Sequence, residues 1–99
     1  MKPPYSVSHG TLRTVDLIES FLGELELWDR AKFKELHAEV PFDAWDSQDN
    51  EWWDSEDASY FLNEDLFDAL NNVAPEGFYF GAHEGDGSDF GFWPIDDNA

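Results

Sequence analysis

The residues of this sequence that are best suited to chemistry or binding are carboxylates that cluster between positions 43 and 68. Ten of those 26 residues are acidic, and neither lysine nor arginine occurs after Lys34. We call these ten the acidic belt; its members are Asp43, Asp46, Asp49, Glu51, Asp54, Glu56, Asp57, Glu64, Asp65 and Asp68. Carboxylates at this density can pair with the lysines and arginines of a basic partner and attract it over a long range.

Two adjacent tryptophans, Trp52 and Trp53, stand inside the acidic belt, seven residues after Trp45. Tryptophan is enriched at the centres of protein interfaces, so this pair is a candidate anchor for a partner. Packing in the core explains the same residue type, and we favour it for at least one of the pair. In a strand, adjacent side chains point to opposite faces, which would leave one ring outward. We therefore predict that the partner-binding residues are Trp52, Trp53 and the acidic belt.

Catalysis has little support in the sequence. The histidines at positions 9, 37 and 83 are scattered, cysteine is absent, and we find no nucleophile-elbow or phosphate-loop motif. Carboxylates are too abundant to single out an acid–base pair, and 99 residues leave little room for a deep pocket. We therefore predict that the protein is not an enzyme and binds no cofactor.

The oxygen-rich run from 83 to 89 contains the residue types of a calcium loop. Counted from Asp86, however, the fifth position of an EF-hand pattern is Phe90, where calcium needs an oxygen ligand. A hairpin turn explains the same glycines and aspartates. We therefore predict a turn here and no metal site.

The overall charge excludes several classes of partner. The chain of 99 residues has 23 acidic and 5 basic side chains, a net charge of −18, where small soluble domains usually carry a magnitude of about 2 to 8. Binding to nucleic acid depends on cations that replace phosphate counterions, so direct binding to DNA or RNA is excluded, and anionic membranes are disfavoured. The absence of cysteine, of a signal-peptide core and of a long apolar run predicts a cytoplasmic protein.

The charge is distributed unevenly along a chain that has enough apolar residues to fold. All five cations and five acids lie in the first 34 residues, so the whole net charge belongs to the last 65. Nine phenylalanines, five tryptophans and three tyrosines supply area for a core. Because no linker or internal repeat separates the two parts, we predict one acidic domain over residues 1–99.

Apolar spacing predicts the elements that position these residues. Helices are expected from about Thr11 to 25, from Asp29 to Glu39 with Pro41 as its end, and over 60–73. Residues 24–28 alternate like a strand but can also join the helices, and 41–59 should be loop with one or two short elements. Aromatic runs on both sides of a Gly-Asp-Gly turn predict a β-hairpin over 77–94, with Phe80 opposite Gly91.

The expected fold class is therefore α+β, with two N-terminal helices and one later helix packed on a small antiparallel sheet that contains the C-terminal β-hairpin. Residues 35–99 resemble, in size and acidity, the small DNA-mimic proteins that phages and plasmids use against restriction or CRISPR effectors. The resemblance is one of composition and carries over no motif and no functional residue; the neutral first third departs from the evenly acidic members of that class.

What the resemblance implies is an inhibitor that occupies the basic nucleic-acid-binding surface of a defence nuclease or CRISPR effector. Because B-DNA carries one phosphate charge per about 1.7 Å, 18 charges match roughly 30 Å of duplex. Two alternatives remain open at this point. The chain can be an immunity protein that neutralises a basic nuclease toxin, or a salt-adapted acidic domain that has no charged partner.

Overall fold

The computed structural model describes residues 5–47, 49–83 and 85–95. Its helical elements are α1 (Thr14–Trp28), α2 (Arg30–His37), the 3₁₀ turns η1 (Phe42–Asp46) and η2 (Glu51–Asp54), α3 (Glu56–Tyr60), the π-helical stretch η3 (Phe61–Leu66) and α4 (Phe67–Val73). Its strands are β1 (Tyr5–Ser8), β2 (Phe78–His83) and β3 (Asp86–Pro94). The α+β class expected from the sequence is confirmed.

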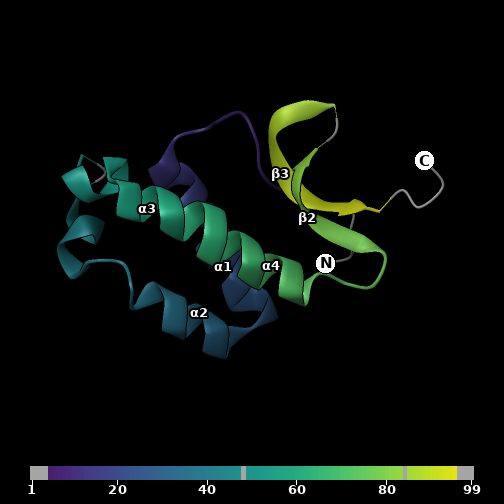
Figure 1. Cartoon of the computed structure of the whole chain (residues 1–99), viewed down its shortest axis with the longest axis horizontal. Coiled ribbons are helices and arrows are strands. Elements are labelled where there is room, and N and C mark those ends of the chain that lie inside the picture. The colour runs from purple at the N-terminus through teal and green to yellow at the C-terminus, as the bar shows by residue number, and fades with distance from the viewer. Residues whose placement is uncertain (1–4, 48, 84, 96–99) are drawn as a thin grey trace.

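The molecule is elongated, with extents of 45 × 28 × 21 Å along its principal axes. The helices fill one part of the long axis and the sheet the other, so that η1 and η2 lie at the end opposite the hairpin (Figure 1). Helix α1 crosses behind the helix formed by α3, η3 and α4 in Figure 1, and it contacts both this helix and α2. Within the described ranges, no helix combines the length and apolar character needed to cross a bilayer.

The first helix begins and ends later than its apolar spacing predicts. Helix α1 starts at Thr14, and Thr11 instead accepts a bond from the Arg13 N–H at 3.2 Å and donates one to Asp16 at 2.8 Å. Residues 24–28 form the end of this helix, which settles the open choice between strand and helix. Helix α2 has the predicted cap, because the Asp29 carboxylate accepts the backbone N–H of Lys32 at 3.0 Å.

The helix predicted over 60–73 starts four residues earlier, at Glu56. Ser55 caps it by accepting the Ala58 N–H at 3.2 Å. Leu62, Leu66 and Leu70, which are spaced four residues apart, form one buried stripe along the π-helical stretch and α4.

The hairpin is confirmed, but the expected register is wrong by one residue. Phe80 pairs with Phe92 and Gly81 with Gly91, because the ladder is irregular where Ala82 pairs with Phe90 and His83 with Asp86. A third strand that we did not predict, β1, pairs antiparallel with β3, and the sheet order is β1-β3-β2.

The core joins the sheet to the helices through Phe21 of α1. Its ring meets Phe80 edge to face at 4.8 Å between centroids and also contacts Phe67 and Phe90. The side chain of Asn71 in α4 bonds to both backbone groups of Phe80, at 3.0 Å to its N–H and 3.1 Å to its carbonyl. These contacts hold the sheet against α4 and so fix the helix that carries half of the acidic belt.

Candidate protein-docking surface

The acidic belt starts on η1 and η2 and continues along the helix from Glu56 into α4 (Figure 1). Nine of its ten side chains are exposed, and Asp65 is half-buried. The structure thus places the predicted carboxylates on the surface, at the end of the molecule away from the hairpin and along one helix that leads back toward it.

Short polar side chains set the turns that present the belt. Asn50 caps η2 by accepting the Trp52 N–H at 2.9 Å. The Ser55 hydroxyl donates to the Trp52 carbonyl at 2.6 Å and also caps α3. Each cap forms a hydrogen bond with a backbone group that has no hydrogen-bond partner within the short helical element. The neighbouring carboxylates of Glu56 and Asp57 lie in the first turn of α3, where the helix dipole favours negative charge.

The belt has no cationic partner within the part of the chain that the structure describes. The ion pairs there are Arg13 with Asp16 at 3.7 Å and Lys32 with Glu35 at 3.2 Å. Both pairs join residues three positions apart, and neither includes a belt carboxylate. The negative charge of the belt is therefore left for solvent ions or a partner to balance.

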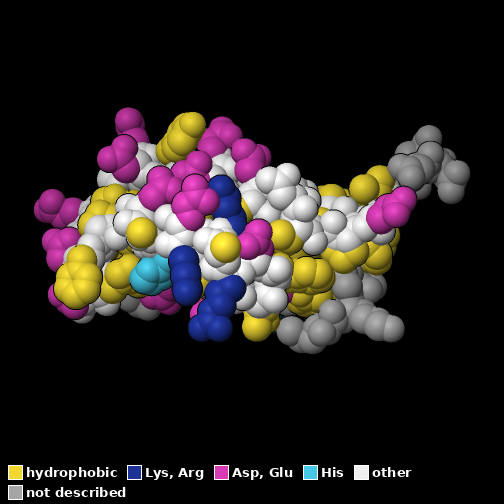
Figure 2. Space-filling view, turned by 90° about the horizontal axis from the view of Figure 1, so that it is seen from below, with side chains coloured by type: hydrophobic (Ala, Val, Ile, Leu, Met, Phe, Trp, Pro, Cys, Tyr) yellow, Lys and Arg dark blue, Asp and Glu magenta, His cyan; other side chains and the backbone are white. Residues whose placement is uncertain are grey.

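The cations do not lie wholly apart from the belt, although all five precede it in the sequence. Lys and Arg side chains gather near the middle of the face seen in Figure 2, with Asp and Glu side chains to their left and directly above them. Lys32 lines a groove that also contains Asp65 and Asp68. Among the described residues, the belt is therefore free of cations at its η1 and η2 end, and it borders α2 at its α4 end.

Trp53 belongs to the core, the position that we favoured for at least one of the tryptophan pair, and its burial argues against direct contact with a partner. Its side chain is 3% exposed, and its indole N–H donates to the carbonyls of Ala44 and Ser47, both at 3.0 Å. The expected alternation of an inward and an outward ring needed a strand, whereas these residues form a 3₁₀ turn with three residues per turn. Buried area and a satisfied N–H give Trp53 a structural role.

Trp52 keeps part of its ring at the surface. The ring packs edge to face on Trp53, with centroids 5.2 Å apart, and on Phe61 at 6.2 Å. Because two neighbouring rings support it, the orientation of Trp52 is fixed before any partner arrives. It is therefore the member of the tryptophan pair that can contact another molecule.

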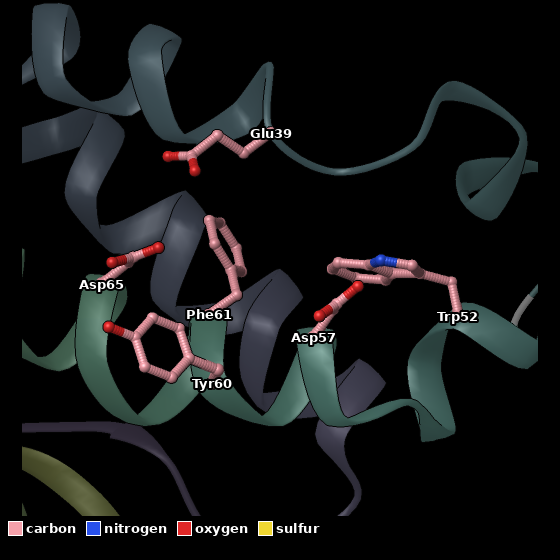
Figure 3. Close-up of a pocket in the computed structure, with 6 residues that line it drawn as sticks. All are labelled: Glu39, Trp52, Asp57, Tyr60, Phe61 and Asp65. Carbon is pink, nitrogen blue, oxygen red and sulfur yellow. The ribbon is translucent and has the colours of Figure 1, made fainter.

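Trp52 lines a surface hollow of about 290 Å³, which we call the acidic–aromatic hollow (Figure 3). Its lining residues are Glu39, Trp52, Asp57, Tyr60, Phe61 and Asp65. The Phe61 ring stands between Asp65 and Trp52, and the Glu39 carboxylate lies across from them on the other wall (Figure 3). Among the described residues, none of the three carboxylates makes a side-chain hydrogen bond or an ion pair.

Three of the predicted site residues, Trp52, Asp57 and Asp65, meet in this hollow, while the other belt residues lie outside it. Sequence reasoning missed three further members: Glu39, Tyr60 and Phe61. One signal was present, because Tyr60 follows Asp57 by three residues and Asp65 follows Phe61 by four, which places each pair on one helix face. The sequence holds no such signal for Glu39, because this residue lies just after α2 and reaches the hollow from a different segment of the chain.

A second hollow of about 290 Å³ shares Glu39 with the first and is lined mainly by His37, Pro41, Phe42 and Trp45. The His37 ring stacks on Trp45, with centroids 5.1 Å apart and planes 7° apart. The Phe42 side chain is 89% exposed. The η1 and η2 end of the belt therefore presents a large exposed apolar side chain, Phe42, as well as carboxylates.

A buried carboxylate lies away from the belt, between α1 and β1. Glu24 is 8% exposed, accepts the Trp28 indole N–H at 2.6 Å and accepts the Tyr5 hydroxyl. Burial, together with donation to Glu24, raises the pKa of Tyr5 to about 12. This group links strand β1 to α1 and makes no contact with the docking surface.

No metal site is formed by the residues that the structure describes, since nowhere do three or more His, Asp or Glu side chains converge as ligands. The hairpin turn that we considered for calcium includes Glu84, which lies outside the described residues. Comparison of the chain with protein-family models, with curated proteins and with solved structures gives no match.

Proposed function

We propose that this protein is an acidic DNA mimic that inhibits a basic nucleic-acid-binding protein by occupying its nucleic-acid surface. The observation that carries the proposal is the uncompensated charge of the belt: nine of its ten carboxylates are exposed, and none is ion-paired among the described residues. A surface that only needs hydration can mix both signs, whereas this one offers a continuous supply of acceptors for lysine and arginine.

The dimensions support mimicry of a short duplex. The long axis of 45 Å is the length of B-DNA that carries about 26 phosphate charges, and the protein holds a net 18 negative charges. The two charge densities agree to within a factor of two. A groove that binds duplex DNA therefore meets a comparable electrostatic field at this protein. The release of the groove's own counterions then contributes a comparable favourable free energy to binding.

The partner class that fits is a defence nuclease or CRISPR effector, met in the cytoplasm. Lysines and arginines in its nucleic-acid groove would pair with the belt, and Trp52 would add apolar contact near the centre of the interface. Trp53 supports this contact from below without touching the partner.

A second candidate, an immunity protein that neutralises a basic nuclease toxin, is favoured by one observation. Exposed Phe42 and half-buried Trp52 lie at the cation-free end of the belt, which is the composition of a compact anchored interface. The two candidates differ in where the partner is held. A DNA mimic sits in the nucleic-acid groove, whereas an immunity protein can bind beside it.

Displacement by DNA tests the proposal. The protein is immobilised and exposed to bacterial lysate at low salt, and bound proteins are eluted with excess short duplex DNA and then with high salt. We expect a nucleic-acid-binding protein in the DNA eluate, with loss of its activity when the free chain is added. A nuclease that elutes only in salt favours the immunity protein, and a column that retains nothing specific refutes both.

A further inference from the structure

We propose that the acidic–aromatic hollow receives the guanidinium group of a single arginine side chain on the partner. This inference rests on the proposed function, because it takes the partner to be a basic protein. It goes further in assigning one place on the belt as the point of specific recognition, while the remaining carboxylates act through long-range attraction.

Charge complementarity is the first argument for a cationic occupant. Asp57 and Asp65 lie on the helix formed by α3 and η3, Glu39 follows α2, and the three line one hollow, yet no described cation pairs with them. The basic residue in the adjoining groove, Lys32, has its ammonium 3.2 Å from Glu35. A cation from outside would therefore gain contacts with carboxylates that have no ion-pair partner among the described residues.

The layout of the carboxylates favours a broad, planar cation over a point charge. The three groups line opposite walls of the hollow in Figure 3 and do not converge on one point, in agreement with the absence of a metal-binding cluster among the described residues. A guanidinium spreads five N–H donors over a plane and can reach carboxylates on two sides. A lysine ammonium is compact and would satisfy one wall only.

The aromatic walls supply the second half of the recognition. Trp52 and Tyr60 line the hollow, and a cation over the face of such a ring is attracted within about 6 Å, most strongly by tryptophan. Trp52 is held by Trp53 and Phe61, so little side-chain freedom is lost on binding. Tyr60 is 65% exposed and would lose contact with water as the arginine covers it.

The volume of the hollow suits a small occupant such as one side chain. A hollow of about 290 Å³ lies at the lower end of the roughly 300 to 1,000 Å³ typical of small-molecule sites. The rim side chains Glu39, Asp57 and Tyr60 are exposed, so a side chain of another protein can enter the hollow from solvent. The occupant is therefore an arginine presented by a protein surface.

The experiment uses single amino-acid amides and needs no partner. The protein is titrated with Nα-acetyl-arginine amide and, separately, with Nα-acetyl-lysine amide, and binding is followed by NMR signals of the Trp52 indole and the Tyr60 ring. We expect saturable binding of the arginine amide, about tenfold tighter than that of the lysine amide. Equal affinity for the two amides, or no saturation, would overturn the inference.

Two charge-matched triple variants separate the hollow from general attraction. Glu39→Gln, Asp57→Asn and Asp65→Asn together should weaken binding of the arginine amide at least about tenfold. The control combines Glu19→Gln, Glu26→Gln and Glu76→Gln, which remove the same charge from exposed sites outside both the hollow and the belt, and should leave the affinity within about twofold. Equal losses in the two variants would contradict a specific site.

The outcomes of this titration and of the DNA displacement are distinct. If the arginine amide shows no preference while a partner is still displaced by DNA, the hollow has no recognition role and the proposed function stands. If the amide binds selectively but no partner is displaced by DNA, the proposed function fails although the hollow binds arginine.

Discussion

The backbone of Tyr5 lies so close to Gly91 that no side chain fits between them. A Cβ atom added at Gly91 would lie 2.2 Å from the Tyr5 carbonyl oxygen and 2.9 Å from Ser6 Cα. Ser6 and Gly91 are partners in the pairing of β1 with β3. The glycine therefore allows the N-terminal strand to join the hairpin, a role that the sequence alone did not reveal.

Gly91→Ala should lower the free energy of unfolding by at least about 1 to 3 kcal/mol, because the new methyl group must push β1 away from β3. Urea denaturation measures the change. Gly23→Ala is the matched control: Gly23 is exposed within α1 with open space around its Cβ direction, so alanine should stabilise the protein by roughly 0.5 to 1 kcal/mol. Similar effects of the two substitutions would contradict the close approach at Gly91.

The local parts of the fold could be predicted from the sequence, but the long-range pairing could not. Apolar spacing and the Asp29 cap indicated α1 and α2, and the aromatic runs indicated the hairpin. The register failed because it depends on an irregularity beside His83 that no residue type marks. Strand β1 was not predicted because the alternation of apolar and polar residues over four positions is too short to indicate a strand. Its position is set by contacts with residues more than 80 positions away in the sequence.

Phe80→Ala should cost roughly 3 to 5 kcal/mol, the usual range for deleting a buried phenylalanine ring. The Phe80 ring is 3% exposed and meets the rings of Phe21, Phe67 and Phe92. Its backbone bonds to Asn71 persist in the variant, so the measured loss reports on ring packing.

Phe42→Ala is the control for the Phe80→Ala substitution. The Phe42 side chain is 89% exposed, so its removal should change stability by no more than about 0.5 kcal/mol. Thermal unfolding of both variants beside the unchanged protein gives the comparison. A small loss for Phe80→Ala would mean that the ring is not part of the core.

The candidate site was predictable in its charge and not in its shape. Exposure of the belt follows from composition, since ten carboxylates without a nearby cation cannot be buried. Which tryptophan faces outward depends on the 3₁₀ turn at 51–54, and the hollow depends on the π-helical stretch and on Glu39 arriving from α2. These features arise from tertiary packing. The spacings of Asp57 with Tyr60 and of Phe61 with Asp65 indicate a shared helix face but not the hollow itself.

Charge on the belt should control how fast a partner associates. Asp46→Asn, Asp49→Asn and Asp54→Asn together should slow association with a DNA-displaceable partner more than they speed dissociation. The effect should shrink as salt rises, because the Debye length is about 8 Å at physiological ionic strength. Stopped-flow mixing at two salt concentrations measures the rate constants.

The control for the association experiment removes the same charge elsewhere. Glu19, Glu26 and Glu76 are exposed and lie outside the belt, and their replacement by glutamine should slow association less. If both triple variants slow it equally, net charge alone attracts the partner and the position of the belt is irrelevant.

Tyr5 should make stability fall at alkaline pH. Its pKa rises from 10.0 to about 12 because of burial and its hydrogen bond to Glu24, so the folded protein keeps the phenolic proton that the unfolded chain loses first. The unfolded state then binds fewer protons above pH 10, and the free energy of unfolding declines from there until pH passes about 12. Tyr5→Phe removes the titrating group and should show a shallower decline over the same window. Urea denaturation of both proteins below and above pH 10 tests this, and parallel declines would show that the contact between Tyr5 and Glu24 does not couple to folding.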